Sequence, residues 1–164
     1  MSQRRRFAWW VLTFGGSGAS PHAPGTVGSL AAVAVIGVLW ASGFREWWIP
    51  LLLAFLIGWA HLAVGDQITQ IFGKADPGAV VSDEVCGQWV ALSVPLVSGV
   101  GWGWPLLIAF GLFRLFDITK ICGVGRLEKI PGKWGVLLDD LLAGVYAGVV
   151  LWALDALGGL ELLP

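Results

Sequence analysis

Five apolar runs, separated by short stretches rich in Gly, Pro and charged residues, dominate the sequence. They cover residues 27–43, 47–64, 85–96, 102–116 and 141–154. A membrane-spanning helix takes roughly 20 apolar residues, with a range of about 17–25, so the first two runs qualify and the other three are short. The chain is 57% hydrophobic and 13% charged, against about 25% charged residues in soluble domains. We therefore predict an all-α polytopic membrane bundle with about five transmembrane or re-entrant helices, forming a single domain over residues 1–164.

The N-terminus carries Arg4, Arg5 and Arg6 ahead of a short, bulky apolar stretch at 7–14. No small-residue cleavage site closes this stretch, which argues against a signal peptide. Basic residues followed by Trp are typical of a segment that lies in the membrane interface. We expect an N-terminal interfacial segment.

The basic residues predict an orientation. With the N-terminus inside and five crossings, nine of the ten Lys and Arg residues fall on the cytoplasmic side and only Arg45 falls outside, as the positive-inside rule favours. The same topology places most acids inside: Asp66, Asp76, Asp83, Glu84, Asp117, Glu128, Asp139 and Asp140. The net charge of −1 indicates no nucleic-acid partner. Cys86 and Cys122 form neither a zinc pattern nor a disulfide framework.

A segment rich in Gly, Ser and Thr precedes the first run, with five glycines and four hydroxyls within residues 14–30. Glycines let backbone N–H groups converge on an anion, and we expect Thr26 or Ser29 to cap the following helix, whose N-terminus favours phosphate. Gly25, Thr26 and Ser29 are therefore candidate phosphate-binding residues. The alternative is an ordinary flexible turn with a helix cap, and His22 is interpreted as a turn residue.

Two acidic pairs, Asp83–Glu84 and Asp139–Asp140, are each expected to open an apolar helix. Small residues follow one and two turns later, at Gly87 and Ala91, Gly144 and Gly148, and Ala143 and Ala147. Such spacing lets membrane helices approach closely, so we expect these two helices to cross near their starts and to gather four carboxylates. The alternatives are simple complementation of the helix dipole and, for the small-residue faces, a homodimer.

A third group, Arg114, Asp117 and Lys120, shares one helix face. It is either a row of interfacial ion pairs or a metal-binding carboxylate flanked by phosphate-binding cations. Clustered carboxylates select Mg²⁺, which often joins a substrate phosphate. The combination indicates phosphate chemistry at a membrane surface. The alternative is a non-enzymatic small transporter or assembly factor. A transporter would place its acids near the bilayer midplane, but the core of every expected span here lacks charge. His61 is the one ionisable residue well inside an expected span, and it lies near the cytoplasmic end of that span.

These motifs together resemble the phosphatidylglycerophosphatase A family of bacteria. The resemblance rests on residues 16–30, 81–89, 113–120 and 135–144. It implies a Mg²⁺-dependent phosphatase of the inner membrane that hydrolyses phosphatidylglycerophosphate to phosphatidylglycerol and phosphate. The implied metal-binding and catalytic residues are Asp83, Glu84, Asp117, Asp139 and Asp140. The implied phosphate-binding residues are Gly25, Thr26, Ser29, Arg114 and Lys120, to which we add Lys133 as a candidate cation.

The chain departs from the family pattern at two places. Residues 121–124 replace the usual Pro-x-Pro stretch, and Gly132-Lys133-Trp134-Gly135 replaces Gly-Gly-x-Gly. The headgroup selectivity therefore stays open, with another lipid phosphate such as phosphatidic acid as an alternative substrate. The nucleophile is also open, since water or an Asp carboxylate could attack phosphorus.

Overall fold

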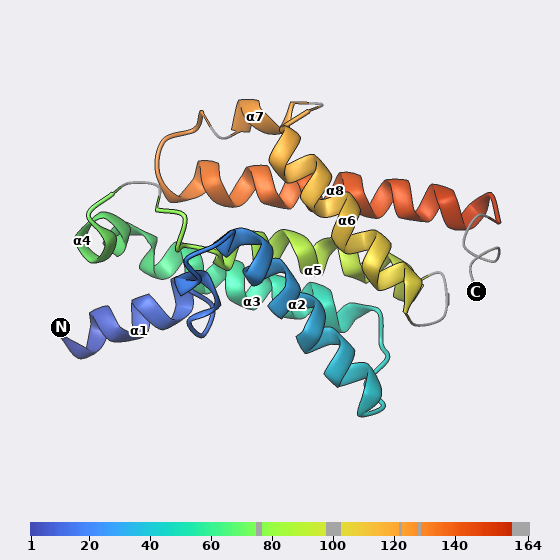
Figure 1. Cartoon of the computed structure of the whole chain (residues 1–164), viewed down its shortest axis with the longest axis horizontal. Coiled ribbons are helices and arrows are strands. Elements are labelled where there is room, and N and C mark those ends of the chain that lie inside the picture. The colour runs from blue at the N-terminus through green and yellow to red at the C-terminus, as the bar shows by residue number, and fades with distance from the viewer. Residues whose placement is uncertain (75–76, 98–102, 122, 128, 159–164) are drawn as a thin grey trace.

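The computed structural model describes residues 1–74, 77–97, 103–121, 123–127 and 129–158. Within these ranges every regular element is helical, which confirms the predicted all-α class (Figure 1). The elements are α1 (Gln3–Leu12), η1 (Ser17–Ala19), α2 (Pro24–Ala41), α3 (Trp48–Val64), η2 (Gly65–Gln67), α4 (Ile68–Phe72), α5 (Ser82–Val97), α6 (Trp104–Thr119), α7 (Val124–Leu127) and α8 (Lys133–Ala156). The acids Asp76, Glu128 and Glu161, together with Cys122, lie outside the described residues.

The five predicted apolar runs correspond to α2, α3, α5, α6 and α8. Pro24, Pro50 and Pro105 each lie in the first turn of a helix, where a missing N–H removes no intrahelical bond. Between α2 and α3 the chain reverses at Gly43, whose φ of 94° is open to glycine at little cost. In the sequence, Pro therefore marks the starts of these helices, and Gly marks the turn between α2 and α3.

Among the described residues, three helical stretches are long and apolar enough to cross a membrane: Pro24–Ala41, Trp48–Phe72 and Lys133–Ala156. Helices α5 and α6 have 16 residues each, so the predicted count of about five spans is not confirmed. Large apolar side chains project outward from the long helices, including Val38, Phe55, Trp59, Val149 and Trp152. Such an apolar exterior is typical of a surface in contact with lipid.

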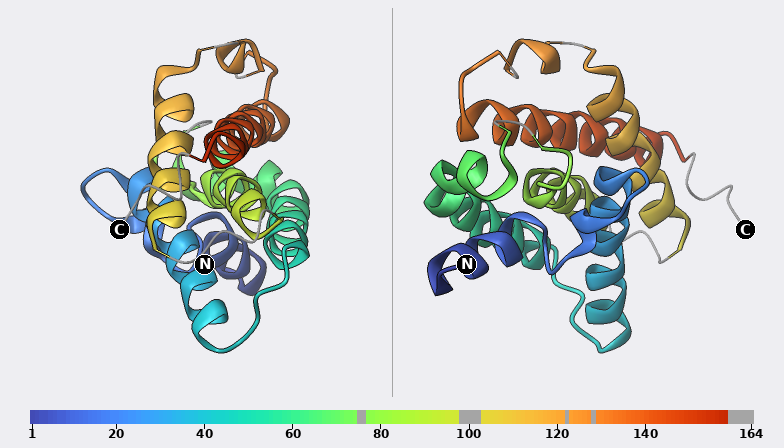
Figure 2. Two further views of the ribbon diagram at one scale, coloured as in Figure 1. Left: turned by 90° about the vertical axis from the view of Figure 1, so that its right-hand side faces the viewer. Right: turned by 60° about the vertical axis from the view of Figure 1, so that its left-hand side comes forward.

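Helix α5 lies at the centre of the bundle, between α8 on one side and α2 and α3 on the other (Figures 1 and 2). Its closest neighbour is α8. A Cβ added at Gly144 would collide with the backbone of Gly87, and a Cβ added at Gly148 would lie 2.7 Å from Cγ2 of Val94. The predicted close approach of these two helices is confirmed, and the small-residue faces are used within one chain.

The helix ends that carry polar residues meet at one end of the bundle. The starts of α5 and α8 approach each other, and the start of α2 reaches α5, since a Cβ at Gly25 would collide with the Glu84 carboxylate. The ends of α3 and α6 join them through His61 and Lys120, which contact α5 and α8. The candidate site therefore lies at this end of the bundle.

Candidate metal and phosphate site

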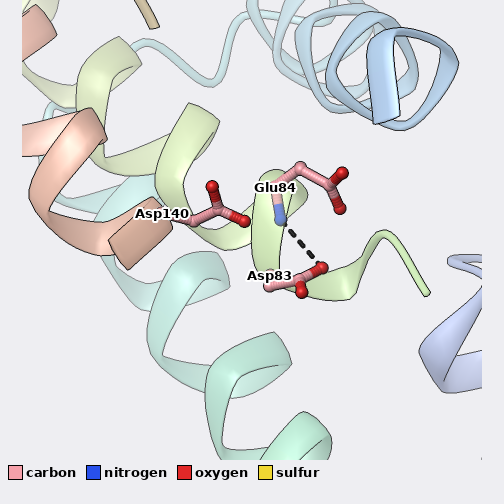
Figure 3. Close-up of side chains that lie close together, drawn as sticks. All are labelled: Asp83, Glu84 and Asp140. Atoms are coloured by element: carbon pink, nitrogen blue, oxygen red, sulfur yellow. Dashed lines mark hydrogen bonds between the residues drawn. The ribbon is translucent and has the colours of Figure 1, made fainter. Parts of the chain in front are cut away.

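Three carboxylates from α5 and α8 face one another. Asp83, Glu84 and Asp140 each offer an oxygen, and these oxygens lie within 4.8 Å of one another (Figure 3). Asp83 and Asp140 are buried. Oδ1 of Asp83 accepts a hydrogen bond from the Glu84 backbone N–H at 3.1 Å, and Oδ1 of Asp139 accepts one from the Asp140 N–H at 3.0 Å. Each pair is thus held by the same local bond. The second oxygen of Asp139 pairs with Lys120, whereas Oε2 of Glu84 and Oδ1 of Asp140 are buried without a hydrogen-bond partner.

The two pairs differ in their place on the helix. Asp83 and Glu84 lie in the first turn of α5, as predicted. The prediction that Asp139–Asp140 opens a helix is wrong, because α8 begins at Lys133. The turn at Gly132, with φ of 77°, starts the helix early, so dipole complementation applies to the first pair only.

Arg114 and Asp117 of α6, with Lys120 directly after this helix, lie beside the same carboxylates. Nη1 of Arg114 lies 2.5 Å from Oδ2 of Asp117, and Nζ of Lys120 lies 3.1 Å from Oδ1 of Asp117 and 2.5 Å from Oδ2 of Asp139. Burial alone would lower the pKa of Lys120, but the hydrogen bond to Asp139 and the charges of Asp140 and Asp117 outweigh it and raise that pKa. Lys120 therefore stays charged and links α6 to α8.

A cavity of about 220 Å³ lies between these elements. All five predicted carboxylates line it, together with Lys120; the remaining wall consists of Pro77, Gly78, Val80 and Val136. A water molecule takes about 30 Å³ of liquid, so the cavity has room for a phosphate group and an ion but not for a whole lipid. Charged groups predicted from separate motifs therefore share one small compartment.

The Gly-rich segment reaches this compartment through Gly25. A Cβ at this position would collide with the Glu84 carboxylate and lie 3.2 Å from Nη1 of Arg114. The prediction that Thr26 or Ser29 caps the helix is wrong, because α2 begins at Pro24 and has no side-chain cap. The Ser29 hydroxyl instead donates to the Gly25 carbonyl at 2.9 Å. Close backbone approach, rather than capping, is what the segment provides here.

Lys133 is placed away from the cavity. Its Nζ lies 2.6 Å from Oδ2 of the exposed Asp66, and it is absent from the cavity lining. A role of Lys133 in phosphate binding stays a prediction. His22, whose backbone carbonyl accepts a hydrogen bond from the Ser20 hydroxyl, is in an exposed turn.

Unpaired polar atoms mark the site within the described part of the chain. The buried side-chain atoms without a hydrogen-bond partner are Glu84 Oε2, Asp140 Oδ1, Arg114 Nε and both amide atoms of Gln88. Buried polar groups are nearly always paired in folded proteins. Two unpaired carboxylate oxygens among hard oxygen donors fit a divalent cation such as Mg²⁺.

Sequence reasoning did not single out Gln88, whose unpaired amide is buried in α5. This residue lies one turn after Glu84 on α5 and is fully buried. Residues four apart share a helix face, so a polar residue within an apolar helix was the available signal.

Comparison with known proteins gives the family. Residues 10–155 match the family model described as Phosphatidylglycerophosphatase A. The chain belongs to the phosphatidylglycerophosphatase A family. The five carboxylates of the cavity, with Arg114 and Lys120, all lie within the matched residues.

Several curated relatives of this family member cover most of its length. A phosphatidylglycerophosphatase A of Haemophilus influenzae is 37% identical over 85% of the chain and 83% of the relative. The Escherichia coli protein of the same name is 30% identical over 88% of the chain and 81% of the relative. A Bacteroides thetaiotaomicron protein named "Putative phosphatidylinositol-3-phosphatase" is 39% identical over 83% of the chain and 86% of the relative. No solved structure matches the chain.

Proposed function

We propose that this member of the phosphatidylglycerophosphatase A family hydrolyses phosphatidylglycerophosphate to phosphatidylglycerol and phosphate, in a Mg²⁺-dependent reaction at the cytoplasmic face of the bacterial inner membrane. The observation that carries the proposal is the shared cavity. It combines five carboxylates with Lys120, and Arg114 is bound to one of them. Names of two relatives supply the substrate.

Asp83, Glu84 and Asp140 are the residues that would hold Mg²⁺. Their oxygens converge, and Glu84 and Asp140 each keep one buried oxygen unpaired. When bound, Mg²⁺ supplies charge neutralisation at the phosphoryl oxygens and lowers the pKa of water. Five carboxylates against two cations leave an excess of negative charge, so a divalent cation would have to be bound before an anionic phosphomonoester could enter the cavity.

The cations and the start of α2 would bind the phosphate. Arg114 presents a planar set of donors that suits phosphate oxygens, and its Nη1 lies near Gly25. Lys120 stands between Asp117 and Asp139, which hold its ammonium at the edge of the cavity. In the reaction a P–O bond breaks, phosphatidylglycerol leaves as the alcohol, and the oxygen of water is retained in inorganic phosphate.

The orientation rests on the distribution of basic residues. Arg4, Arg5 and Arg6 precede α2, and Lys120 and Arg126 follow α6, whereas Arg45 lies in the opposite connection between α2 and α3. Cytoplasmic loops are enriched in Lys and Arg. The cavity would then open to the cytoplasm.

The test is phosphate release from phosphatidylglycerophosphate in detergent, with Mg²⁺ or with EDTA. We expect EDTA to abolish release, and Asp83→Asn and Asp140→Asn to lower kcat at least 100-fold, since each removes a charged ligand. Asp155→Asn is the matched control, because it changes an acid at the other end of α8. Release that persists with EDTA or in both site variants would disprove the metal site.

A second candidate is hydrolysis of another lipid phosphate. The name of the Bacteroides relative favours including phosphatidylinositol-3-phosphate in the assay. Phosphatidic acid and its lyso form complete the panel. A higher kcat/KM for any of these than for phosphatidylglycerophosphate would reassign the substrate while leaving the phosphatase chemistry intact.

A further inference from the structure

A buried histidine outside the carboxylate cavity connects three helices. His61 is on the last turn of α3 and is fully buried. Its Nδ1 lies 2.8 Å from Oγ of Ser82, the first residue of α5, and its Nε2 lies 3.3 Å from the backbone carbonyl of Lys133, the first residue of α8. Both ring nitrogens therefore contact the starts of the two helices that bear the acidic pairs.

The partners fix the direction of these hydrogen bonds for a neutral ring. A carbonyl oxygen only accepts, so Nε2 carries the hydrogen and donates to Lys133. Nδ1 is then an acceptor, and the Ser82 hydroxyl donates to it. In this tautomer the ring pairs with one group on each helix.

Other contacts strengthen the connection at the same place. Gly65, just after α3, lies against the Lys133 side chain, where a Cβ would be 2.7 Å from that of Lys133. The Lys133 ammonium pairs with Asp66. The end of α3 thus holds the first residue of α8, which has no side-chain cap of its own.

The acids lie close to these anchored residues along each helix. Ser82 directly precedes Asp83, and Lys133 lies six residues before Asp139, or roughly 9 Å along the helix axis at 1.5 Å per residue. A change in the spacing of the anchored residues would therefore alter the distance between Asp83 and Asp140.

We propose that His61 is a positioning residue: by joining the starts of α5 and α8, it sets the separation of the two acidic pairs and hence the affinity of the site for a divalent cation. The proposal rests on the proposed function of that site. His61 does not line the carboxylate cavity. Ser82 is fully buried and absent from the cavity lining as well, so the two do not form a nucleophile and base for the lipid.

The test uses His61→Leu, His61→Asn and His61→Gln, since the amide of Asn reproduces a polar group near Nδ1 and that of Gln one near Nε2. Two quantities are measured: the Mg²⁺ concentration for half-maximal phosphate release, and the rise in thermal midpoint on adding Mg²⁺. We expect His61→Leu to raise the half-maximal Mg²⁺ concentration about 10-fold or more, the range typical of residues that orient metal ligands. The KM for lipid at saturating Mg²⁺ should change less than twofold, and Asn or Gln should restore part of the Mg²⁺ affinity.

Cys86→Ala is the matched control. Sγ of Cys86 donates to the Ala54 carbonyl at 3.1 Å, so this variant also removes a buried bond between α3 and α5. It should lower the thermal midpoint without changing the Mg²⁺ requirement. The proposal is wrong if the His61 variants keep the wild-type Mg²⁺ requirement, or if Cys86→Ala shifts it equally. The Mg²⁺-induced change in thermal midpoint needs no turnover, so it separates failure of this proposal from failure of the proposed phosphatase activity.

Discussion

Gln88 is a fully buried polar residue on the apolar helix α5. Its amide nitrogen and oxygen are both buried and unpaired, one turn from the unpaired Oε2 of Glu84. Leaving a buried polar group without a partner costs about 1–3 kcal/mol. Gln88 is therefore a position where a substitution should change the stability of the protein.

We expect Gln88→Leu to stabilise the ligand-free protein by about 1–3 kcal/mol, because it replaces two unpaired polar atoms with an apolar group of similar volume. The measurement is the thermal midpoint in detergent with EDTA. Gln70→Leu is the control, since Gln70 is exposed on α4, and surface changes usually stay within about 0.5 kcal/mol. A lower midpoint for Gln88→Leu would show that the amide is paired in the ligand-free protein.

Individual acids and the local partners of Asp117 were accessible to sequence reasoning, whereas partners distant in the sequence were not. Adjacent carboxylates at Asp83–Glu84 and Asp139–Asp140 stand out in an apolar sequence, and the three-residue spacing placed Asp117 between two cations. The bond from Lys120 to Asp139 joins residues 19 positions apart, and no local pattern contains it. The same holds for His61, whose partners are 21 and 72 positions away.

The acidic pairs come together because helices α5 and α8 pack against each other. This packing was predictable because small residues recur every four positions, so that one face of each helix lacks bulk. The start of α8 was not predictable, because the residues between Gly132 and Asp139 lie outside the apolar run at 141–154 and follow Pro131–Gly132, which is typical of a loop. The structure extends the helix back to Lys133, so the acids project from its side.

We expect Gly144→Ala to destabilise the protein by about 1–3 kcal/mol or more, the usual cost of overpacking, and to lower activity by displacing Asp140. The added Cβ has no space against the Gly87 backbone. Thermal midpoint and phosphate release are the measurements. Gly111→Ala on α6 is the control: a Cβ there meets nothing within 4 Å, and Ala favours a helix over Gly. Equal midpoints for the two variants would contradict the close contact.

At the scale of the molecule, hydropathy predicted the helical class and the sites of reversal. It also identified residues 27–43 and 47–64 as long enough to span and residues 85–96 and 102–116 as short, in agreement with α2, α3, α5 and α6. It missed the full length of α8, which extends back from residue 141 to Lys133. Hydropathy also does not show that α5 lies at the centre of the bundle, because the burial of α5 comes from packing against α2, α3, α6 and α8.

The proposed orientation predicts where added cysteines react. In a background with Cys86 and Cys122 replaced by Ser, Arg45→Cys should react in intact cells with a maleimide that does not cross the inner membrane. Arg126→Cys should react only after the membrane is permeabilised, because positive loops face the cytoplasm. The opposite labelling pattern would reverse the topology and remove the cavity from the cytoplasmic face.

The contact between Gly87 and Gly144 also bears on biosynthesis. The carboxylates come from α5, α6 and α8, so a chain still emerging from the ribosome has Asp83, Glu84 and Asp117 in place before α8 is made. Until α8 inserts against α5, Asp139 and Asp140 are missing and Lys120 lacks its partner on that helix. The enzyme would therefore acquire activity in one late step, when its last described helix enters the membrane, and partly synthesised chains would leave lipid phosphates untouched.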